Sequence, residues 1–488
     1  MRASCLVIAA ALLTGCTFGP NYKRPQVDVP ANFRAPEPLP APQAASFADL
    51  KWFEVFQDEK LQDLIRTALV QNFDLRDAVT RVEQARANLG ITRSNQIPQV
   101  SASSELNVTR TSRDGAFALP PGIPFQQNRN FGQAGLNLLS FELDIWGRLR
   151  RATEAARADL LNAEETRKAV VSTLVSQLAA DYLQLRELDY ELEISETTLK
   201  NRQDFLQLTQ QRQVGGVATL LDLRQAEQLV ETAAASIPTT RQQIEQTENQ
   251  IDLLLGQNPG TVSRGRSNAR PPDQFVRIGD TLIPTMNTLI DQHIPDVPTG
   301  LPSALLERRP DIRAAEQALV AANANIGVAK AAYFPQITLT GSIGGQSSTL
   351  SNLFSGPNGT WSFVPQLTQP IFTAGRLRSN VRLAEAQRDQ ALVAYERSIQ
   401  TAFSDVSNAL IAHQRTRETR VEQERLVATL EDRKRLAYVR YQGGVDTQLN
   451  ALDADRDLFA TELTLAQVRY SELVSVVQLY KALGGGWQ

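Results

Sequence analysis

An internal duplication constrains this chain more than any other feature. Pro98-Gln99 recurs as Pro335-Gln336 at an offset of 237 (335 − 98), and Gly215-Gly216-Val217 recurs as Gly443-Gly444-Val445 at an offset of 228 (443 − 215). Matches that keep their order at nearly constant offsets indicate one structural unit that occurs twice. Each copy is predicted to contain a helix, an alternating segment, a very long helix, a Gly-Gly turn and a returning helix.

The two arms around the first Gly-Gly turn repeat apolar residues every seven positions. They are Val171, Leu178, Leu185, Leu192, Leu199 and Leu206 on the outgoing arm, and Leu223, Val230, Ile237, Ile244 and Ile251 on the returning arm. Such a seam indicates helices that wind around each other with a left-handed twist. The outgoing helix, predicted over 147–213, would be about 100 Å long. Pro238 predicts a kink in the returning arm. Taken alone, this pattern favours a soluble antiparallel coiled coil.

The segments between the helices alternate apolar and small polar residues with a period of two. Val100 to Val108, Ile337 to Ile343 and Trp361 to Ile371 each place apolar side chains on one face and Ser, Thr, Asn or Gln on the other. A second segment changes phase at Leu139, which predicts a β-bulge. The pattern favours strands with one lipid-facing and one wet face. The alternative is two hairpins packed as a small soluble sandwich.

Four strands in one chain are too few to close a membrane barrel. Single-chain barrels begin at about eight strands, and open strand edges are not tolerated in lipid. After the N-terminal segment the chain has no apolar stretch of about 18 residues that could form a spanning helix instead. The chain must therefore oligomerise, and the periodicity does not choose between a dimer and a trimer.

The N-terminus resembles a lipoprotein export signal. Arg2 precedes the apolar run Leu6–Leu13, which ends in Leu13-Thr14-Gly15-Cys16, similar to a lipobox. Cys5 lies within the signal, so Cys16 would be the only thiol of the mature chain and no intramolecular disulfide could form. Thr17 follows the cysteine, and a residue other than Asp at this position resembles lipoproteins that are sent to the outer membrane. The alternative is an ordinary signal peptide with a chance cysteine.

Charge and motif content argue against nucleic-acid binding and against catalysis. The formal net charge is −3, and no basic patch stands out, so nucleic acid is not an expected partner. The only two histidines, His293 and His413, lie far apart. No P-loop, dinucleotide fingerprint, nucleophile elbow or zinc-protease motif occurs. We therefore expect no enzyme, no metal site and no cofactor.

Signature-like segments occur along nearly the whole mature chain. They are Cys16–Pro25, Trp52–Asp58, Ser140–Arg148, Gly300–Ser303, Glu307–Glu316, Tyr333–Pro335, Pro370–Phe372, Gly375-Arg376 and Leu479–Trp487. In this order they resemble the TolC-like outer-membrane factor family, in its OprM- and NodT-like lipoprotein branch. The resemblance implies an α+β membrane protein that forms a homotrimer. Its twelve-stranded β-barrel would be continued by a long α-helical coiled-coil barrel with a mixed equatorial domain.

The resemblance and the duplication together predict the domain boundaries. They are 1–15 for the signal, 16–60 for a Pro-rich tether and equatorial segment, 61–257 for the first repeat, 258–301 for an equatorial segment, 302–484 for the second repeat and 485–488 for the tail. Within the repeats the expected elements are hairpins at about 99–144 and 336–372, long helices at about 147–213 and 375–441, and return helices at about 219–256 and 446–483.

The resemblance also implies the function. The chain would be the exit duct of a tripartite efflux pump, passively conducting drugs or other small molecules to the cell exterior. Its partners would be a periplasmic adaptor protein, an inner-membrane RND-type transporter and outer-membrane lipid. It would lie in the outer membrane, anchored by N-acyl and S-diacylglycerol groups on Cys16, and extend into the periplasm. The alternatives are a protein-secretion channel of the same fold and a non-conducting lipoprotein scaffold.

Two sets of site residues follow from the family plan. Adaptor docking is expected at the helix turns, at Val214, Gly215, Gly216, Val217, Gly443, Gly444 and Val445, although the glycines also have a purely conformational explanation. A periplasmic gate is expected at Leu449, Asp453, Asp457, Leu221 and Asp222. Leu449, Asp453 and Asp457 share one helix face because they are spaced i, i+4, i+8. Gln225 stands in the first copy where Asp453 would align, so the acidic ring would hold three acids. The alternative is an ordinary solvated helix face.

Overall fold

The computed structural model describes residues 17–36, 46–56, 58–110, 128–264, 275–278, 281–284 and 302–487. The signal peptide and Cys16 lie outside these residues, as do parts of the Pro-rich tether and of the 258–301 segment. In the part of the chain that is described, no helix combines the length and the apolar character needed to cross a membrane. The described residues form two compact units. Unit 1 takes residues from 1–26, 81–164 and 314–396, and unit 2 from 27–80, 165–313 and 397–488.

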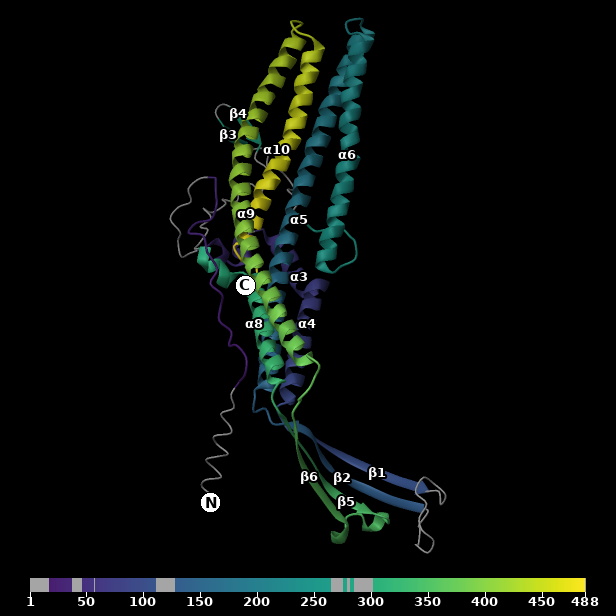
Figure 1. Ribbon diagram of the computed structural model, residues 1–488. Helices are drawn as coiled ribbons and strands as arrows, with labels where there is room; N and C mark the ends of the chain where they lie inside the picture. Colours follow the sequence, from purple (N-terminus) through teal and green to yellow (C-terminus); the bar gives the residue numbers. More distant parts are fainter. Residues whose placement is uncertain are drawn as a thin grey trace. The chain divides into compact units, whose positions relative to one another are not determined.

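Unit 1 contains a four-stranded antiparallel sheet (Figure 1). Its strands are β1 (Val100–Arg110), β2 (Asn128–Glu142), β5 (Gln336–Ser347) and β6 (Gly359–Thr368), in the order β1-β2-β5-β6. The pairing of β2 with β5 joins a hairpin from the first copy to a hairpin from the second. Within the described sheet, β1 and β6 are therefore edge strands.

The strand register separates two chemically different faces. One cross-strand row contains Ala102, Leu136, Ile343 and Trp361, and the adjacent row contains Ser101, Asn137, Ser342 and Ser362. Directly paired residues share a face of a sheet, and successive residues alternate between faces. On the polar face the hydroxyl groups of Ser342 and Ser362 lie 2.8 Å apart. The predicted alternation of an apolar and a polar face is confirmed.

Two details of the sheet test the sequence analysis. The register between β2 and β5 shifts between Leu138 and Phe141, so the predicted bulge at Leu139 is confirmed. The predicted end of the last strand at about 372 is wrong, because β6 ends at Thr368. Pro370 follows closely and has no N–H to donate to a neighbouring strand, so Ile371 lies beyond the sheet.

The long helices begin and end within two residues of their expected ranges. They are α5 (Arg148–Val214), α6 (Leu220–Leu255), α9 (Arg376–Gln442) and α10 (Gln448–Ala482), and α6 is one helix through Pro238. The remaining helices are α2 (Trp52–Val55), α3 (Glu59–Gln71), α4 (Phe73–Ser94), α7 (Leu305–Arg308) and α8 (Pro310–Ala331). Short 3₁₀ turns are η1 (Phe47–Asp49), η2 (Pro302–Ala304), η3 (Leu350–Asn352) and η4 (Gly356–Asn358), and β3 (Phe275–Ile278) pairs with β4 (Thr281–Pro284).

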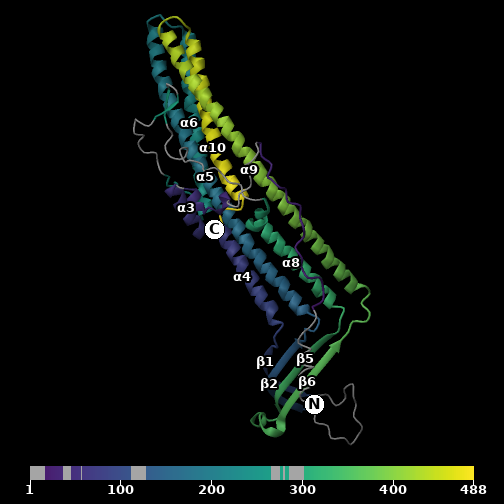
Figure 2. The same ribbon diagram turned by 90° about the vertical axis from the view of Figure 1, so that its left-hand side faces the viewer.

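In unit 2, five of the eleven heptad residues of α5 and α6 are buried. Leu178 and Leu185 of α5 are fully buried, as is Ile251 of α6, and Val230 and Ile244 are also buried. Figures 1 and 2 show α5 alongside α6 and α9 alongside α10 in both views. The seven-residue repeat therefore identifies part of the buried apolar side of these helices, and its other members are half-buried.

Asn72 separates α3 from α4 and fastens them to the end of α6. The Asn72 amide nitrogen donates to the Leu254 carbonyl oxygen at 2.9 Å, and its side-chain oxygen accepts from the Leu75 N–H at 2.9 Å. Opposite it, Gly256 ends α6 with a φ of 70°. A Cβ on Gly256 would lie 2.6 Å from the Gln71 carbonyl oxygen, so this approach requires glycine.

Candidate functional site

The two Gly-Gly turns of unit 2 lie at the same end of its helical hairpins (Figures 1 and 2). Gly216 and Gly444 both have a φ of 73°, a left-handed conformation that L side chains rarely adopt. Among the tip residues, Val217 is 79% exposed and Val445 is 67% exposed. Val214 is also exposed. The glycines therefore make the reversal, while the valines present apolar side chains to the outside.

A chain of hydrogen bonds connects the two hairpins just behind the turns. The Tyr441 hydroxyl donates to the Gln448 side-chain oxygen at 3.0 Å, and the Gln448 amide nitrogen donates to the Asp222 carbonyl oxygen at 2.8 Å. The Asp222 carboxylate caps α6, where it accepts from the Thr219 N–H and hydroxyl, both at 2.8 Å. Asp222 is thus committed to a helix N-terminus, where a carboxylate is stabilising.

The predicted gate residues of α10 lie on one side of that helix with an arginine between the two acids. Leu449 is 50% exposed, and its first-copy counterpart Leu221 is also exposed. The Arg456 guanidinium lies 3.2 Å from the Asp453 carboxylate and 3.3 Å from that of Asp457. Arg433 of α9 pairs with Asp457 at 2.7 Å. The residue spacing predicts the two acids but not the role of Arg456, although its i+3 position from Asp453 is a signal for such a pair.

Two arginines beside Asp457 lower the pKa of its carboxyl group. The hydrogen bond from Arg433 holds the pKa of the Asp457 carboxyl below its ordinary value, and the hydrogen bond from Arg456 acts in the same direction. An opposite charge at this distance favours the ionised form of a carboxyl group. Asp457 is therefore an anion paired with two arginines, whereas Asp453, on the same helix face as Leu449, shares Arg456 with it.

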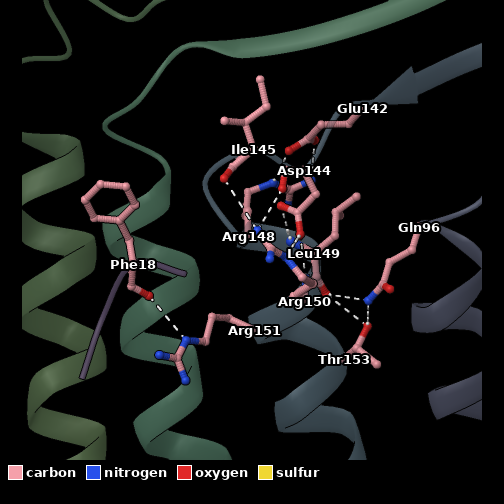
Figure 3. Close-up of polar contacts among 10 residues, drawn as sticks. All are labelled: Phe18, Gln96, Glu142, Asp144, Ile145, Arg148, Leu149, Arg150, Arg151 and Thr153. Atoms are coloured by element: carbon pink, nitrogen blue, oxygen red, sulfur yellow. Dashed lines mark hydrogen bonds and ion pairs between the residues drawn. The ribbon is translucent and has the colours of Figure 1, made fainter. Parts of the chain in front are cut away.

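The residues that follow the Cys16 position are docked on unit 1. The Phe18 ring lies 4.2 Å from the Phe334 ring, which stacks on Trp146 at 4.9 Å. Arg151 donates to the Phe18 carbonyl oxygen at 3.3 Å (Figure 3). It also donates to the Asn21 side-chain oxygen at 2.6 Å. The first part of the expected tether is therefore fixed to the helices of unit 1.

The signature segment Ser140–Arg148 forms the junction from strand β2 to helix α5 (Figure 3). The Asp144 carboxylate accepts from the N–H groups of Leu149 and Arg150 at 3.0 and 2.9 Å, which caps the helix. Arg148 donates twice to Glu142, at 2.9 and 2.6 Å. Such a bidentate pair fixes the angle between strand and helix more strictly than a single contact.

The described residues offer no metal centre. Among them, no group of three His, Cys, Asp or Glu side chains is placed to hold a metal ion. The chemistry that the unit 2 tips and hairpin faces can perform is recognition, steric closure and charge selection.

Comparisons with known proteins extend over both repeats. A family model described as outer membrane efflux protein matches residues 64–257 and 301–485. The cation efflux system protein CusC of Escherichia coli is 36% identical over 479 residues, which covers 98% of this chain and 97% of CusC. The toluene efflux pump outer membrane protein TtgF of Pseudomonas putida is 38% identical over 495 residues, covering 100% of this chain and 98% of TtgF.

A solved structure shows the same fold. The crystal structure of the open state of the Neisseria gonorrhoeae MtrE outer membrane channel matches with a TM-score of 0.82 and 31% identity, covering 97% of this chain and 99% of MtrE. The chain therefore belongs to the outer membrane efflux protein family, and it is an outer-membrane efflux channel with the α+β fold of the solved channels.

Proposed function

We propose that this chain is one subunit of a homotrimeric exit duct in a tripartite efflux pump. Three four-stranded sheets would close into one twelve-stranded barrel, and the long helices would continue the passage through the periplasm. The duct would passively conduct drugs or other small molecules that an inner-membrane RND-type transporter and a periplasmic adaptor deliver. The observation that carries this proposal is the sheet of unit 1, with its two edges and two unlike faces.

The sheet edges support assembly. Strands β1 and β6 each lack a second partner in the order β1-β2-β5-β6. Unpaired backbone groups at a sheet edge are costly in lipid, so an edge from one subunit must pair with an edge from the next. All residues of β6 are exposed in the single chain, including Trp361, Phe363 and Leu367. In the proposed trimer, lipid would cover the exposed apolar side chains of this strand, and a neighbouring subunit would pair with its edge.

The names of the relatives favour small molecules over proteins as the cargo. CusC is named for cation efflux and TtgF for toluene efflux. A protein-secretion channel of the same fold is therefore the weaker alternative. A non-conducting scaffold would need neither a polar sheet face nor a row of hydroxyl side chains such as Ser342 and Ser362.

Co-purification tests the proposed assembly. After mild crosslinking of cells, an affinity-tagged version of the full chain should retain one periplasmic adaptor and one inner-membrane transporter, identified by mass spectrometry. Recovery of the trimer without either partner under conditions that preserve a known pump would contradict the tripartite assignment.

The gate forms part of the same proposal. Three copies of Leu449 would narrow the periplasmic end of the duct, and three copies of Asp453 would form an acidic ring that attracts cations and repels anions. The support for it is the exposed Leu449 on the same helix face as Asp453. Gln225 in the equivalent position of α6 keeps the ring at three acids.

Charged replacements at the tips should remove resistance without breaking the trimer. Val217→Glu with Val445→Glu places charge on two exposed apolar side chains that we propose contact the adaptor. Because both side chains are exposed in this structure, we expect folding to be unaffected. Minimal inhibitory concentrations in a strain that depends on this channel would fall to those of a deletion. Unchanged resistance, with trimers at normal abundance, would count against docking at these turns.

Lipidation at Cys16 gives a separate prediction. Cys16→Ser should abolish acylation, because the thioether requires the thiol, whereas the trimer should still assemble through its own strands. Mass spectrometry of the mature N-terminus decides the matter. A wild-type protein whose N-terminal peptide is unmodified, or begins at another residue, would refute the lipoprotein assignment.

A further inference from the structure

One buried cluster in unit 2 connects all four long helices of the hairpins. The Asp455 carboxylate of α10 accepts from the Arg202 guanidinium of α5 at 2.7 Å through one oxygen. Its other oxygen lies 2.5 Å from the Lys434 ammonium group of α9. Arg202 also donates to the Leu229 carbonyl oxygen of α6 at 2.9 Å. The side chains of Arg202 and Asp455 are each only 3% exposed. We refer to Arg202, Asp455 and Lys434 as the hairpin node.

The surroundings of Arg202 hold it in one place. Its guanidinium lies 4.9 Å from the centre of the Phe459 ring, so Arg202 contacts α10 through both a charge and an aromatic face. Its Nη2 atom is buried and has no acceptor among the described residues. A buried ion pair with one unpaired donor is a costly way to gain stability alone. Buried polar groups inside coiled coils are best established as devices that select one register.

The hairpin node has no equivalent made of the same residues at the matching positions of the two copies. At the offset of 228, Arg202 corresponds to Leu430 (202 + 228), Lys434 to Leu206 (434 − 228) and Asp455 to Glu227 (455 − 228). Leu430 is buried in an apolar cluster with Val427, Leu458 and Leu465. Within the described part of the chain, Glu227 forms an ion pair with its neighbour Arg224 at 2.6 Å. At each of the two positions where one copy places a cation of the hairpin node, the other copy therefore has a leucine.

Asp455 is also close in sequence to the proposed gate. It lies two residues after Asp453 and six after Leu449, on the opposite, buried side of α10. A rotation or slide of α10 would therefore move Leu449 and Asp453 together. Because α10 is held by contacts from both α5 and α9 at Asp455, the hairpin node restricts such movement relative to each neighbour.

We propose that Asp455, gripped by Arg202 and Lys434, is a positioning residue that sets the register of α10 and so holds Leu449 and Asp453 in the closed arrangement. This inference rests on the proposed gate function. The node itself does not touch the conducted molecule. Its role is to favour one of two arrangements of the α9–α10 hairpin, so its loss shifts the balance toward the open one.

Current recordings on purified full-length trimers in planar bilayers test this. Asp455→Asn leaves Arg202 with a neutral partner, and we expect the open fraction of the resting channel to rise by about tenfold. The matched control is Glu227→Gln, the equivalent change in the first copy, which should leave the resting current unchanged.

A second variant separates positioning from folding. Arg202→Leu with Asp455→Leu removes both buried charges, so that neither is left unpaired in the core, and at position 202 it copies Leu430 of the other repeat. Lys434 is 28% exposed and can turn its ammonium group toward water. We expect trimers as heat-resistant as the wild type but with a raised resting current.

The outcomes distinguish this inference from the gate itself. Heat-resistant Arg202→Leu/Asp455→Leu trimers with wild-type resting current would overturn the positioning role, provided that Leu449→Ala/Asp453→Ala raises the current. If neither double variant raises the current, the gate proposal fails and the positioning role fails with it. A raised current in both, with Glu227→Gln silent, supports both.

Discussion

Replacing Leu449 and Asp453 together by alanine should widen the resting duct and raise its conductance several-fold. Leu449 supplies the apolar bulk of the proposed constriction and Asp453 its charge, so the double change removes both the steric and the electrostatic barrier. Each of the three subunits would lose both groups, so the change in the width and charge of the duct is larger than one altered subunit would produce. Cells carrying the variant should become sensitive to large antibiotics such as vancomycin, which would leak inward.

Asp453 should also control ion selectivity by itself. Asp453→Ala alone leaves Arg456 without its nearer acidic partner, so the periplasmic end would change from an acidic to a more basic surface. The reversal potential in a salt gradient should move toward anion preference. Gln225→Ala, at the aligned position of the first copy, is the matched control and should leave both conductance and selectivity unchanged. A double variant that assembles normally but has wild-type conductance and no new sensitivity would contradict the gate.

Glu462→Gln should stabilise the subunit at alkaline pH and flatten its pH dependence. Burial raises the pKa of the Glu462 carboxyl to about 7, against the lowering effect of Lys434, while Glu431 and Asp455 add to the rise. Between the ordinary value of 4.5 and about 7, the folded state holds a proton that the unfolded state has released. Stability therefore falls as pH increases through this window. The full difference corresponds to about 3 kcal/mol per subunit.

The measurement is thermal unfolding of detergent-solubilised protein at pH 5 and pH 8. Wild type and variant should have similar midpoints at the lower pH, where Glu462 is protonated, and the variant should unfold at a higher temperature at the upper pH. Glu422→Gln, an exposed residue paired with Arg425, controls for the loss of one negative charge. If the Glu462→Gln midpoint changes with pH as much as the wild-type midpoint, Glu462 is not the group that titrates.

The elements that carry a regular pattern of apolar residues could be predicted from the sequence. The seven-residue seam of Leu178 and Leu185 and the alternation around Ile343 are local patterns, and each directly reports which side of its element is buried or apolar. The bulge at Leu139 was visible as a phase change in the same way. The end of β6 was missed because the apolar alternation continues to Ile371, although the strand pairing stops at Thr368.

The interactions that we propose position the candidate gate could not be predicted in the same way. Arg202 and Asp455 are far apart in sequence, and neither belongs to an apolar pattern that would mark it as buried. A charged residue in a helix is usually exposed to solvent. The periodicity of apolar residues therefore could not predict that Arg202 and Asp455 are buried. The capping of α6 by the Asp222 carboxylate could not be predicted either, because that role depends on where the helix begins.

Single-channel recording of the wild-type protein tests the central claim most directly. Purified trimers, recognised by their conversion to monomers on heating in detergent, should insert into planar bilayers and produce discrete conductance steps of uniform size. The proposed ring of three Asp453 carboxylates predicts that the current through these channels is carried mainly by cations. Trimers that insert into the bilayer but carry no current under any voltage, with the Leu449→Ala/Asp453→Ala variant equally silent, would contradict the assignment of this chain as a conducting exit duct.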